Sequence, residues 1–206
     1  MENKENNQVL NEILNAYNVR DRISLDNFNL DGKHKNILDF GCGFGWPTST
    51  LATSLPDMTV IGYDIDQERI DSAKKVFHSS PSSFTSSIKE IKENGPYDNI
   101  ISSFVIEDSG PEILGDIHDL LPSEGILILF FYDIKGKDID QFDFNTGAEK
   151  YIFNKIGREN ALKRWSQKNT KDYIKDVQQI GLTVLKTDEV PQSNHKYGYL
   201  VAQKQS

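Results

Sequence analysis

The sequence predicts an α/β protein built on a central, mostly parallel sheet of seven strands with an antiparallel C-terminal hairpin strand. From about residue 37 to residue 131, short apolar runs alternate with amphipathic segments, which is the pattern of successive β-α-β units. Two further strand-like runs follow near the end of the chain with a turn between them. With 206 residues, 37% of them apolar, the chain is expected to form a single domain, 1–206, without disulfide or metal support.

Most of the expected strands are short apolar runs that end in polar or turn-forming residues, and the third, at residues 83–85, is a weak one. The first ends in Asp39 before a glycine-rich segment, and the second ends before Asp64. The fourth begins after the aromatic-Asp pair Tyr97-Asp98 and ends in two serines. The strands are expected at residues 37–39, 60–63, 83–85, 99–103, 126–131, 182–188 and 197–203.

Helices are expected where apolar residues recur every three or four positions. Asp66 precedes one such segment as a typical N-cap, and Pro111 suits the first turn of another. Thr170 is expected to cap a later helix, whose end is marked by Gly181. The expected helices cover residues 46–55, 67–78, 86–93, 111–121 and 171–180.

Two segments lie outside this alternation. Residues 1–30 contain apolar positions at helical spacing and are expected to form a helical cap on the domain. Residues 132–169 are polar with scattered aromatic side chains, and we expect them to form an insertion that acts as a substrate lid. The apolar positions of the first segment are Val9, Leu10, Ile13, Leu14 and Tyr17. The aromatic residues of the second segment are Phe142, Phe144, Tyr151, Phe153 and Trp165.

The most informative motif is Asp39-x-Gly41-x-Gly43-x-Gly45, which directly follows the first strand. Glycines let the chain turn sharply and bring bare backbone N–H groups against a ligand. In the Gly-x-Gly-x-x-Gly motif of dinucleotide-binding folds the third glycine would fall at position 46, which here is Trp46. The spacing therefore disfavours NAD, although a glycine cluster can also be only a tight structural turn.

A second acidic residue follows the second strand. Asp64 lies 19 positions after Gly45, and a carboxylate there can accept hydrogen bonds from both ribose hydroxyls of a nucleoside. The alternative is that Asp64 or Asp66 only caps the next helix. We assign the cap to Asp66 and the ligand contact to Asp64.

Together with residues 97–107, these motifs resemble those of the class I S-adenosylmethionine-dependent methyltransferases over roughly residues 35–131. The resemblance implies a Rossmann-like methyltransferase fold, S-adenosylmethionine as cofactor and no metal. Ile65 would pack on the adenine, but residues 84–88 lack the acidic residue that usually holds the adenine amino group. The implied cofactor-binding residues are Asp39, Gly41, Cys42, Gly43, Gly45, Asp64, Ile65, Ser103 and Phe104.

Methyl transfer requires mainly in-line positioning, and a base matters only when the acceptor must lose a proton. Glu107 and Asp108 follow the fourth strand and Tyr132 follows the fifth, so these three are candidate catalytic residues without a firm assignment. Asp108 could equally be the N-cap of the helix that begins near Pro111.

The amino-acid composition indicates which classes of binding partner to expect. A net charge of −8 argues against nucleic acid, because binding to phosphates depends largely on Lys and Arg displacing counterions. One cysteine and the lack of a long apolar run favour a reducing cytoplasm and no membrane partner. We therefore expect a methyltransferase for a small-molecule acceptor. The alternatives are a propylamine transferase or cyclase on the same scaffold, or a non-catalytic methyltransferase-like binding subunit.

Overall fold

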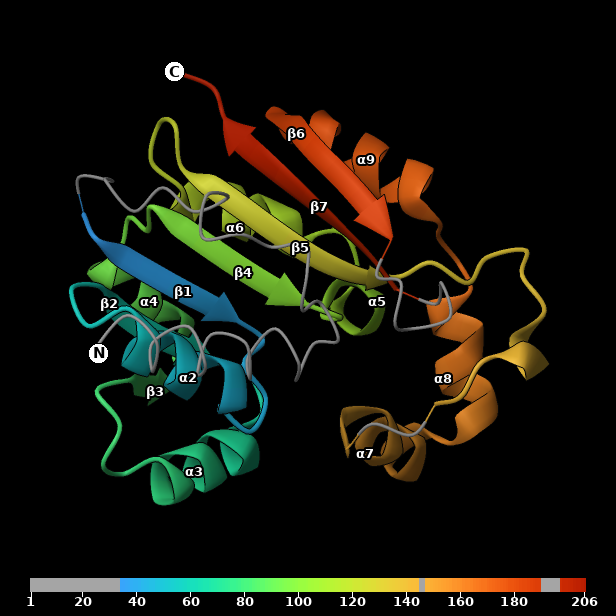
Figure 1. The fold of residues 1–206 in the computed structure, drawn as a ribbon, viewed down its shortest axis with the longest axis horizontal. Helices are drawn as coiled ribbons and strands as arrows, with labels where there is room; N and C mark the ends of the chain where they lie inside the picture. Colours follow the sequence, from blue (N-terminus) through green and yellow to red (C-terminus); the bar gives the residue numbers. More distant parts are fainter. Residues whose placement is uncertain (1–33, 145–146, 190–196) are drawn as a thin grey trace, which may run out of the picture.

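The computed structural model describes residues 34–144, 147–189 and 197–206. Within these ranges the chain forms a seven-stranded sheet of order β3-β2-β1-β4-β5-β7-β6, in which β7 runs antiparallel to both of its neighbours (Figure 1). The expected α/β fold with a mostly parallel sheet and an antiparallel C-terminal hairpin is confirmed. The strands are β1 (Asn36–Phe40), β2 (Thr59–Tyr63), β3 (Ser83–Thr85), β4 (Asn99–Ser103), β5 (Ile126–Tyr132), β6 (Leu182–Glu189) and β7 (Tyr197–Lys204). The expected helix within residues 1–30 lies outside the described residues.

The described helices comprise five that were expected and four further helical segments, at residues 106–109, 139–141, 147–156 and 158–165, that were not expected. They are α2 (Trp46–Ser54), α3 (Gln67–Val76), α4 (Ile88–Asn94), α5 (Ile106–Ser109), α6 (Ile113–Leu120), the 3-10 turn η2 (Ile139–Gln141), α7 (Gly147–Ile156), α8 (Arg158–Trp165) and α9 (Thr170–Gln179).

Helix caps confirm one expectation, correct a second and exclude the capping alternative for Asp108. Asp66 caps α3 by accepting a hydrogen bond from the Glu68 N–H, as expected. The cap of α9 is Asn169 rather than Thr170, because the Asn169 side chain and Asp172 form a reciprocal capping box. Asp108 caps nothing, since it lies inside the additional short helix α5 and α6 begins after Glu112 without a side-chain cap.

Side chains of β5 divide the core into two layers. All seven residues of this strand are buried, as expected for a central strand covered on both faces. Ile128 and Phe130 pack in one cluster, and Leu127 and Phe131 pack in the cluster on the opposite face. Phe131 stacks on Tyr173, which attaches α9 to that second face.

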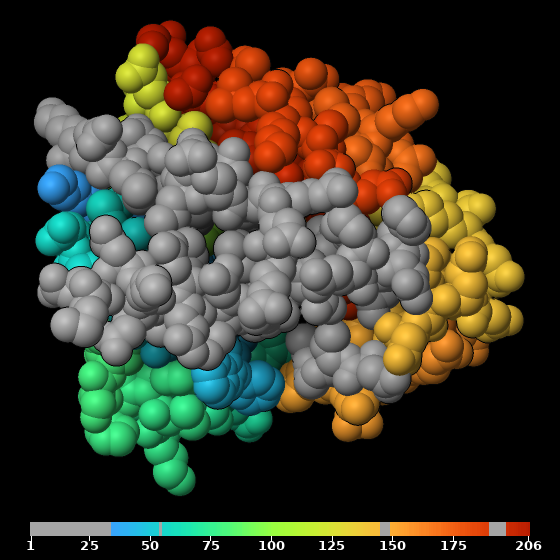
Figure 2. All heavy atoms as spheres, viewed as in Figure 1, coloured from blue at the N-terminus to red at the C-terminus, as the bar shows by residue number. Residues whose placement is uncertain are grey.

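The segment 132–169 is more ordered than its polar sequence indicated. It begins with the last residue of β5 and contains η2, α7 and α8, so its aromatic residues are not scattered along an irregular loop. Phe142, Phe144 and Trp165 are buried in the first core cluster, and the Trp165 ring lies parallel to that of Tyr132 with centroids 4.1 Å apart. These rings anchor the segment to the sheet, and in the space-filling view its yellow to orange residues gather at one end of the molecule (Figure 2).

Candidate functional site

The candidate site lies where the carboxyl ends of the parallel strands meet. Asp39 of β1 is in register with Gly62 of β2 and with Ile101 of β4, so the segments that follow these strands emerge side by side. Ligands of open α/β sheets bind at this edge, where the strand order reverses. Figure 1 shows α7 and α8 beyond the arrowheads of β1 and β4, on the side of this edge.

The three glycines after β1 differ in what surrounds them. All have a positive φ, a backbone conformation that favours glycine. A Cβ at Gly41 would lie 2.0 Å from Val105 Cγ2, and one at Gly45 would lie 2.5 Å from the Phe84 ring. A Cβ at Gly43 would have no neighbour within 4 Å. Packing therefore explains Gly41 and Gly45, whereas Gly43 leaves space that a ligand could use.

Asp64 is tied directly to this glycine loop. Its Oδ2 accepts a hydrogen bond of 2.9 Å from the Gly43 N–H, and its Oδ1 accepts one of 2.9 Å from the Asp66 N–H. The guanidinium of Arg69 lies 3.5 Å from Oδ2. A carboxylate has about four lone-pair positions, so Asp64 keeps acceptor capacity for a ligand hydroxyl.

Asp39 and Cys42 are buried beside the loop. Asp39 accepts a hydrogen bond of 2.6 Å from the Thr48 hydroxyl through Oδ2, and burial raises its pKa to about 7. Burial, with smaller contributions from Asp39 and Asp64, also raises the pKa of the Cys42 thiol. Because that thiol stays protonated at neutral pH, it is not poised as a nucleophile.

Unpartnered polar atoms concentrate at the same edge. Buried polar side-chain atoms normally have hydrogen-bond partners, so exceptions mark sites that call for an explanation. Four of the five such atoms found among the described residues belong to β1, β4 or α5, and the fifth is on α3. The atoms without a hydrogen-bond partner are Asp39 Oδ1, Ser102 Oγ, Ser103 Oγ, Glu107 Oε2 and Arg69 Nε, the last of which lies 3.6 Å from Asp66 Oδ2, within ion-pair distance.

Phe104 directly follows β4, the strand between β1 and β5. Its backbone φ is +59°, which is rare for a bulky residue and is found mainly in turns or functional sites. The Phe104 ring centroid lies 4.9 Å from those of Tyr132 and Tyr197. Together the three rings form an aromatic wall next to the end of β4.

The three candidate bases, Glu107, Asp108 and Tyr132, differ in their hydrogen bonds and in their pKa shifts. Oε1 of Glu107 accepts hydrogen bonds from the Tyr132 N–H and from the Tyr173 hydroxyl, at 2.8 and 3.0 Å, while Oε2 has no partner. Burial raises the pKa of Glu107 to about 7, close to the pH at which a general base works best. Of the three candidates, Glu107 is the one that combines a pKa near neutrality with a carboxylate oxygen that has no hydrogen-bond partner.

The other two candidates have different surroundings. Asp108 lies 4.0 Å from Arg164 of α8, and its pKa is raised by burial although that cation opposes the shift. The Tyr132 hydroxyl donates to Glu149 of α7, which also accepts from Tyr197. Burial holds the pKa of Tyr132 well above its usual value, so its hydroxyl stays protonated at neutral pH.

Ile65 borders a groove of about 680 Å³ and is 81% exposed. The site residues expected from the sequence did not include Arg69 of α3 or Lys155 of α7, which flank or line this groove, and Tyr151 of α7 was expected only as an aromatic residue of the lid. Arg69 could have been suspected from its position one helical turn after Asp66, but nothing in the sequence links it to the two α7 residues. The groove is lined by Ile65, Asp66, Gln67, Glu68, Tyr151, Asn154 and Lys155.

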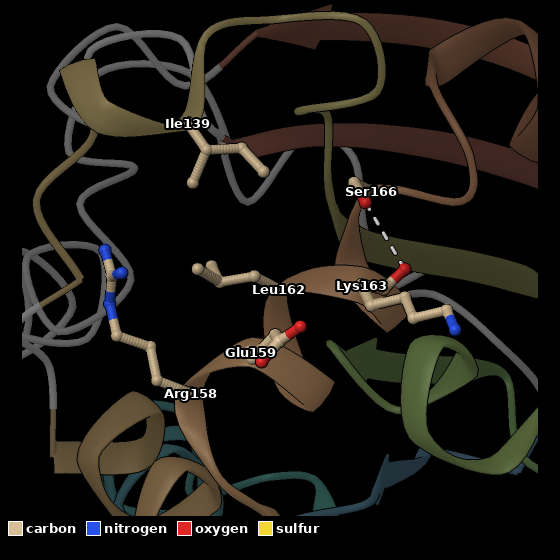
Figure 3. A pocket seen from close by; sticks show the side chains of 6 residues that line it. All are labelled: Ile139, Arg158, Glu159, Leu162, Lys163 and Ser166. Atoms are coloured by element: carbon tan, nitrogen blue, oxygen red, sulfur yellow. Dashed lines mark hydrogen bonds between the residues drawn. The ribbon is translucent and has the colours of Figure 1, made fainter.

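A second groove, of about 540 Å³, lies on α8 and contains none of the expected site residues. Arg158 and Lys163 lie on opposite sides of Leu162, which faces Ile139 (Figure 3). No cluster of three or more potential metal-ligating side chains is present in the part of the chain that the structure describes. None of the helices described there is long and apolar enough to cross a membrane.

Comparison with known proteins decides the family. The family model for the methyltransferase domain matches residues 14–186. The chain belongs to the methyltransferase domain family. The expected resemblance to methyltransferases is thereby confirmed.

Individual relatives share a third or less of their residues with this chain. A malonyl-[acyl-carrier protein] O-methyltransferase of Acetivibrio thermocellus is 33% identical over 131 residues, 61% of this chain and 46% of that protein. The chain thus matches less than half the length of this curated relative. Magnesium protoporphyrin IX methyltransferase of Synechocystis, solved with S-adenosylhomocysteine, is 19% identical with a TM-score of 0.60, covering 95% of this chain and 84% of the other. Human N-acetylserotonin methyltransferase, solved with S-adenosylmethionine, is 17% identical with a TM-score of 0.62, and the match covers 97% of this chain and 55% of the human chain.

Proposed function

We propose that this methyltransferase uses S-adenosylmethionine to methylate a small-molecule acceptor. The observation that carries the proposal is the open face of the glycine loop at Gly43, whose N–H is hydrogen-bonded to Asp64. Asp64 is the carboxylate that would hold the ribose hydroxyls. The bound cofactors of solved relatives with the same fold support this choice.

The residues present fit such a cofactor. Gly43 leaves room for close approach of a ligand to the backbone, and the unpartnered Asp39 Oδ1 and Ser103 Oγ are polar atoms that a polar ligand would satisfy. Ile65 would pack on the adenine from its exposed position. The adenine amino group lacks an acidic partner within residues 84–88, but Glu90 of α4 accepts a hydrogen bond from Thr85 and brings a carboxylate to this strand end.

The bound cofactor supplies an activated methyl group on a sulfonium, so the protein must mainly position the acceptor. Phe104, Tyr132 and Tyr197 would form the wall that excludes water beside the transferred group. Glu107 would accept the proton from an acceptor that must lose one, through its unpartnered Oε2. The segment 132–169 would carry acceptor selectivity, because α7 and α8 lie at the carboxyl edge of the sheet.

Calorimetric titration of the purified protein with S-adenosylmethionine and S-adenosylhomocysteine tests this proposal. We expect both to bind, because neither the glycine loop nor Asp64 contacts the methyl group in the proposed arrangement. Methyl transfer to an acceptor panel, followed by mass spectrometry, separates a methyltransferase from a propylamine transferase or cyclase. A protein that binds neither nucleoside would contradict the proposal.

Glu107→Gln should change the pH dependence of stability. Burial raises the pKa of Glu107 from 4.5 to about 7, so the folded state binds this proton more tightly than the unfolded state does. The stability contributed by the protonated form is full below pH 4.5 and is lost as the pH rises to about 7. Urea unfolding should show Glu107→Gln losing less stability than the wild type across this window, by roughly 3 kcal/mol.

The matched control is Glu159→Gln, which changes an exposed glutamate of α8. It should leave the pH profile of the wild type unchanged. Identical profiles for the wild type and Glu107→Gln would mean that Glu107 titrates normally in the folded chain.

Nucleic acid should not bind. The chain has 31 acidic against 23 basic residues, and electrostatic association with phosphates is strongest at low salt. An electrophoretic binding assay at low salt should therefore leave RNA and DNA unshifted. Tight, salt-sensitive retention of either would contradict the small-molecule assignment.

A further inference from the structure

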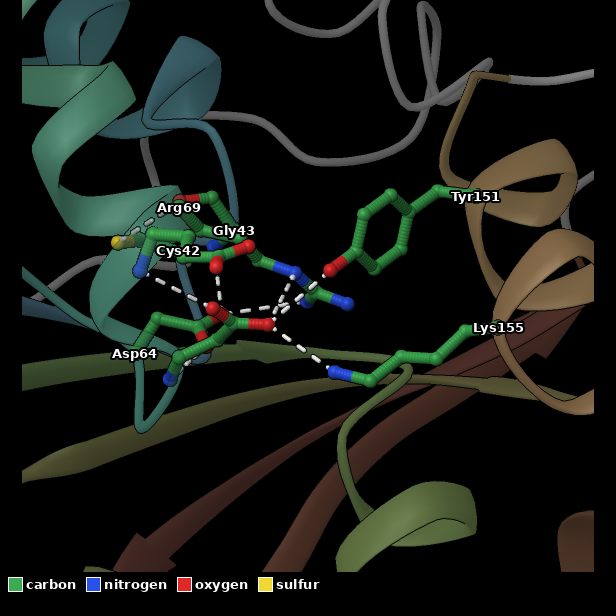
Figure 4. Close-up of polar contacts among 8 residues, drawn as sticks. Cys42, Gly43, Asp64, Arg69, Tyr151 and Lys155 are labelled. Atoms are coloured by element: carbon green, nitrogen blue, oxygen red, sulfur yellow. Dashed lines mark hydrogen bonds and ion pairs between the residues drawn. The ribbon is translucent and has the colours of Figure 1, made fainter.

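Helix α7 reaches across to the residues that flank Asp64. Tyr151 and Lys155 extend from α7 toward Arg69 and the glycine loop, so that residues far apart in sequence meet at one point (Figure 4). The Tyr151 hydroxyl donates a hydrogen bond of 3.1 Å to Asp66 Oδ2, and the Lys155 ammonium lies 3.0 Å from the same oxygen. Asp66 thus serves both α3 and α7, because its Oδ1 accepts the capping bond from Glu68.

Arg69 is held between these groups. Its guanidinium lies over the Tyr151 ring, 4.3 Å from the centroid, and 6.0 Å from the centroid of Phe44 at the glycine loop. The rings of Phe44 and Tyr151 meet edge to face at 5.5 Å. A cation over an aromatic ring is stabilised by the ring quadrupole, so Tyr151 fixes where the guanidinium sits.

The contacts of Arg69 continue to the proposed ribose carboxylate. Arg69 Nη1 lies 3.5 Å from Asp64 Oδ2, and that oxygen also accepts the hydrogen bond from the Gly43 N–H. Only 7% of the Asp64 side chain and 19% of the Arg69 side chain are exposed, so the pair is largely screened from water. The connection runs from Tyr151 through Arg69 and Asp64 to Gly43.

We infer that Tyr151 is a positioning residue for the cofactor, acting through Arg69 on the orientation of Asp64. This inference rests on the proposed function, since it requires Asp64 to hold the ribose. Under this inference α7 has two roles. It belongs to segment 132–169, which is proposed to select the acceptor, and it also shapes the nucleoside site. Movement of α7 on acceptor binding would consequently change cofactor affinity.

A double-mutant cycle on S-adenosylhomocysteine affinity tests the inference. Calorimetry compares the wild type, Asp64→Ala, Tyr151→Ala and the double variant. Tyr151→Ala should weaken binding about tenfold, in the range expected for a partly desolvated cation–ring contact. The double variant should bind no more weakly than Asp64→Ala, because Tyr151 has no route to the ribose once Asp64 is gone.

Two further variants separate positioning from structure. Tyr151→Phe keeps the ring over Arg69 and should retain most of the affinity, and Arg69→Lys should lose as much as Tyr151→Ala. Lys150→Ala changes an exposed residue of the same helix and should bind like the wild type. Thermal unfolding of each variant reports whether the fold is intact.

The outcomes distinguish the inference from the proposed function. Wild-type affinity in Tyr151→Ala, or losses that multiply fully in the double variant, would overturn the role of Tyr151 while leaving a loss in Asp64→Ala as support for the cofactor site. Full affinity in Asp64→Ala would contradict the proposed ribose contact itself.

Discussion

Gly43→Val is expected to weaken S-adenosylhomocysteine binding by about 100-fold or more. Of the three glycines in the loop, Gly43 is the one with open space at its Cβ position, where a ligand can approach the backbone closely. The Val side chain would occupy the space that the cofactor requires. Since no atom lies within 4 Å of the added Cβ, the variant should still fold. The positive φ of Gly43 should cost about 1 to 2 kcal/mol of stability. Calorimetry measures the affinity and urea unfolding measures the stability.

Gly136→Val provides the matched control. Gly136 also has a positive φ and open space around its Cβ position, but it lies in the loop after β5. Both variants should lose a similar amount of stability, and only Gly43→Val should lose affinity. Unchanged affinity in Gly43→Val and in Asp64→Ala together would refute the placement of the cofactor.

Trp165→Ala should lower the free energy of unfolding by about 3 to 5 kcal/mol. Trp165 is 2% exposed and contacts Tyr132, Phe144 and Phe153 through its ring. Removing the indole would leave a cavity between α8 and the sheet, and the neighbouring rings cannot collapse fully into it. The loss should appear as a lower urea midpoint with an unchanged slope.

Trp46→Ala is the control, since Trp46 is the other tryptophan of the chain and is 64% exposed. It contacts Phe77 edge to face, so its removal should cost less than about 1 kcal/mol. Equal losses in the two variants would show that the α8 aromatic residues do not anchor segment 132–169.

Local patterns in the sequence predicted the elements of the sheet. Strands β1, β2, β4 and β5 contain apolar runs, and helices separate them, so burial preferences along the chain specify most of the alternation. Asp66 was identifiable as a cap because capping depends on a contact two residues away. The family also followed from local motifs, since the glycine spacing and the acidic residue after β2 lie in short segments.

Contacts between distant segments were decided only by the tertiary structure. The aromatic residues of segment 132–169 gave no clear period, and their burial depends on a surface that β5 and β7 provide. The stack of Tyr151 on Arg69 joins residues 82 positions apart, and the hydrogen bond from Tyr173 to Glu107 joins residues 66 positions apart. The sequence by itself determined which residues could form the glycine loop and its carboxylate. Packing of α7 and α9 decided which side chains surround them, because such contacts depend on how whole elements dock rather than on local periodicity.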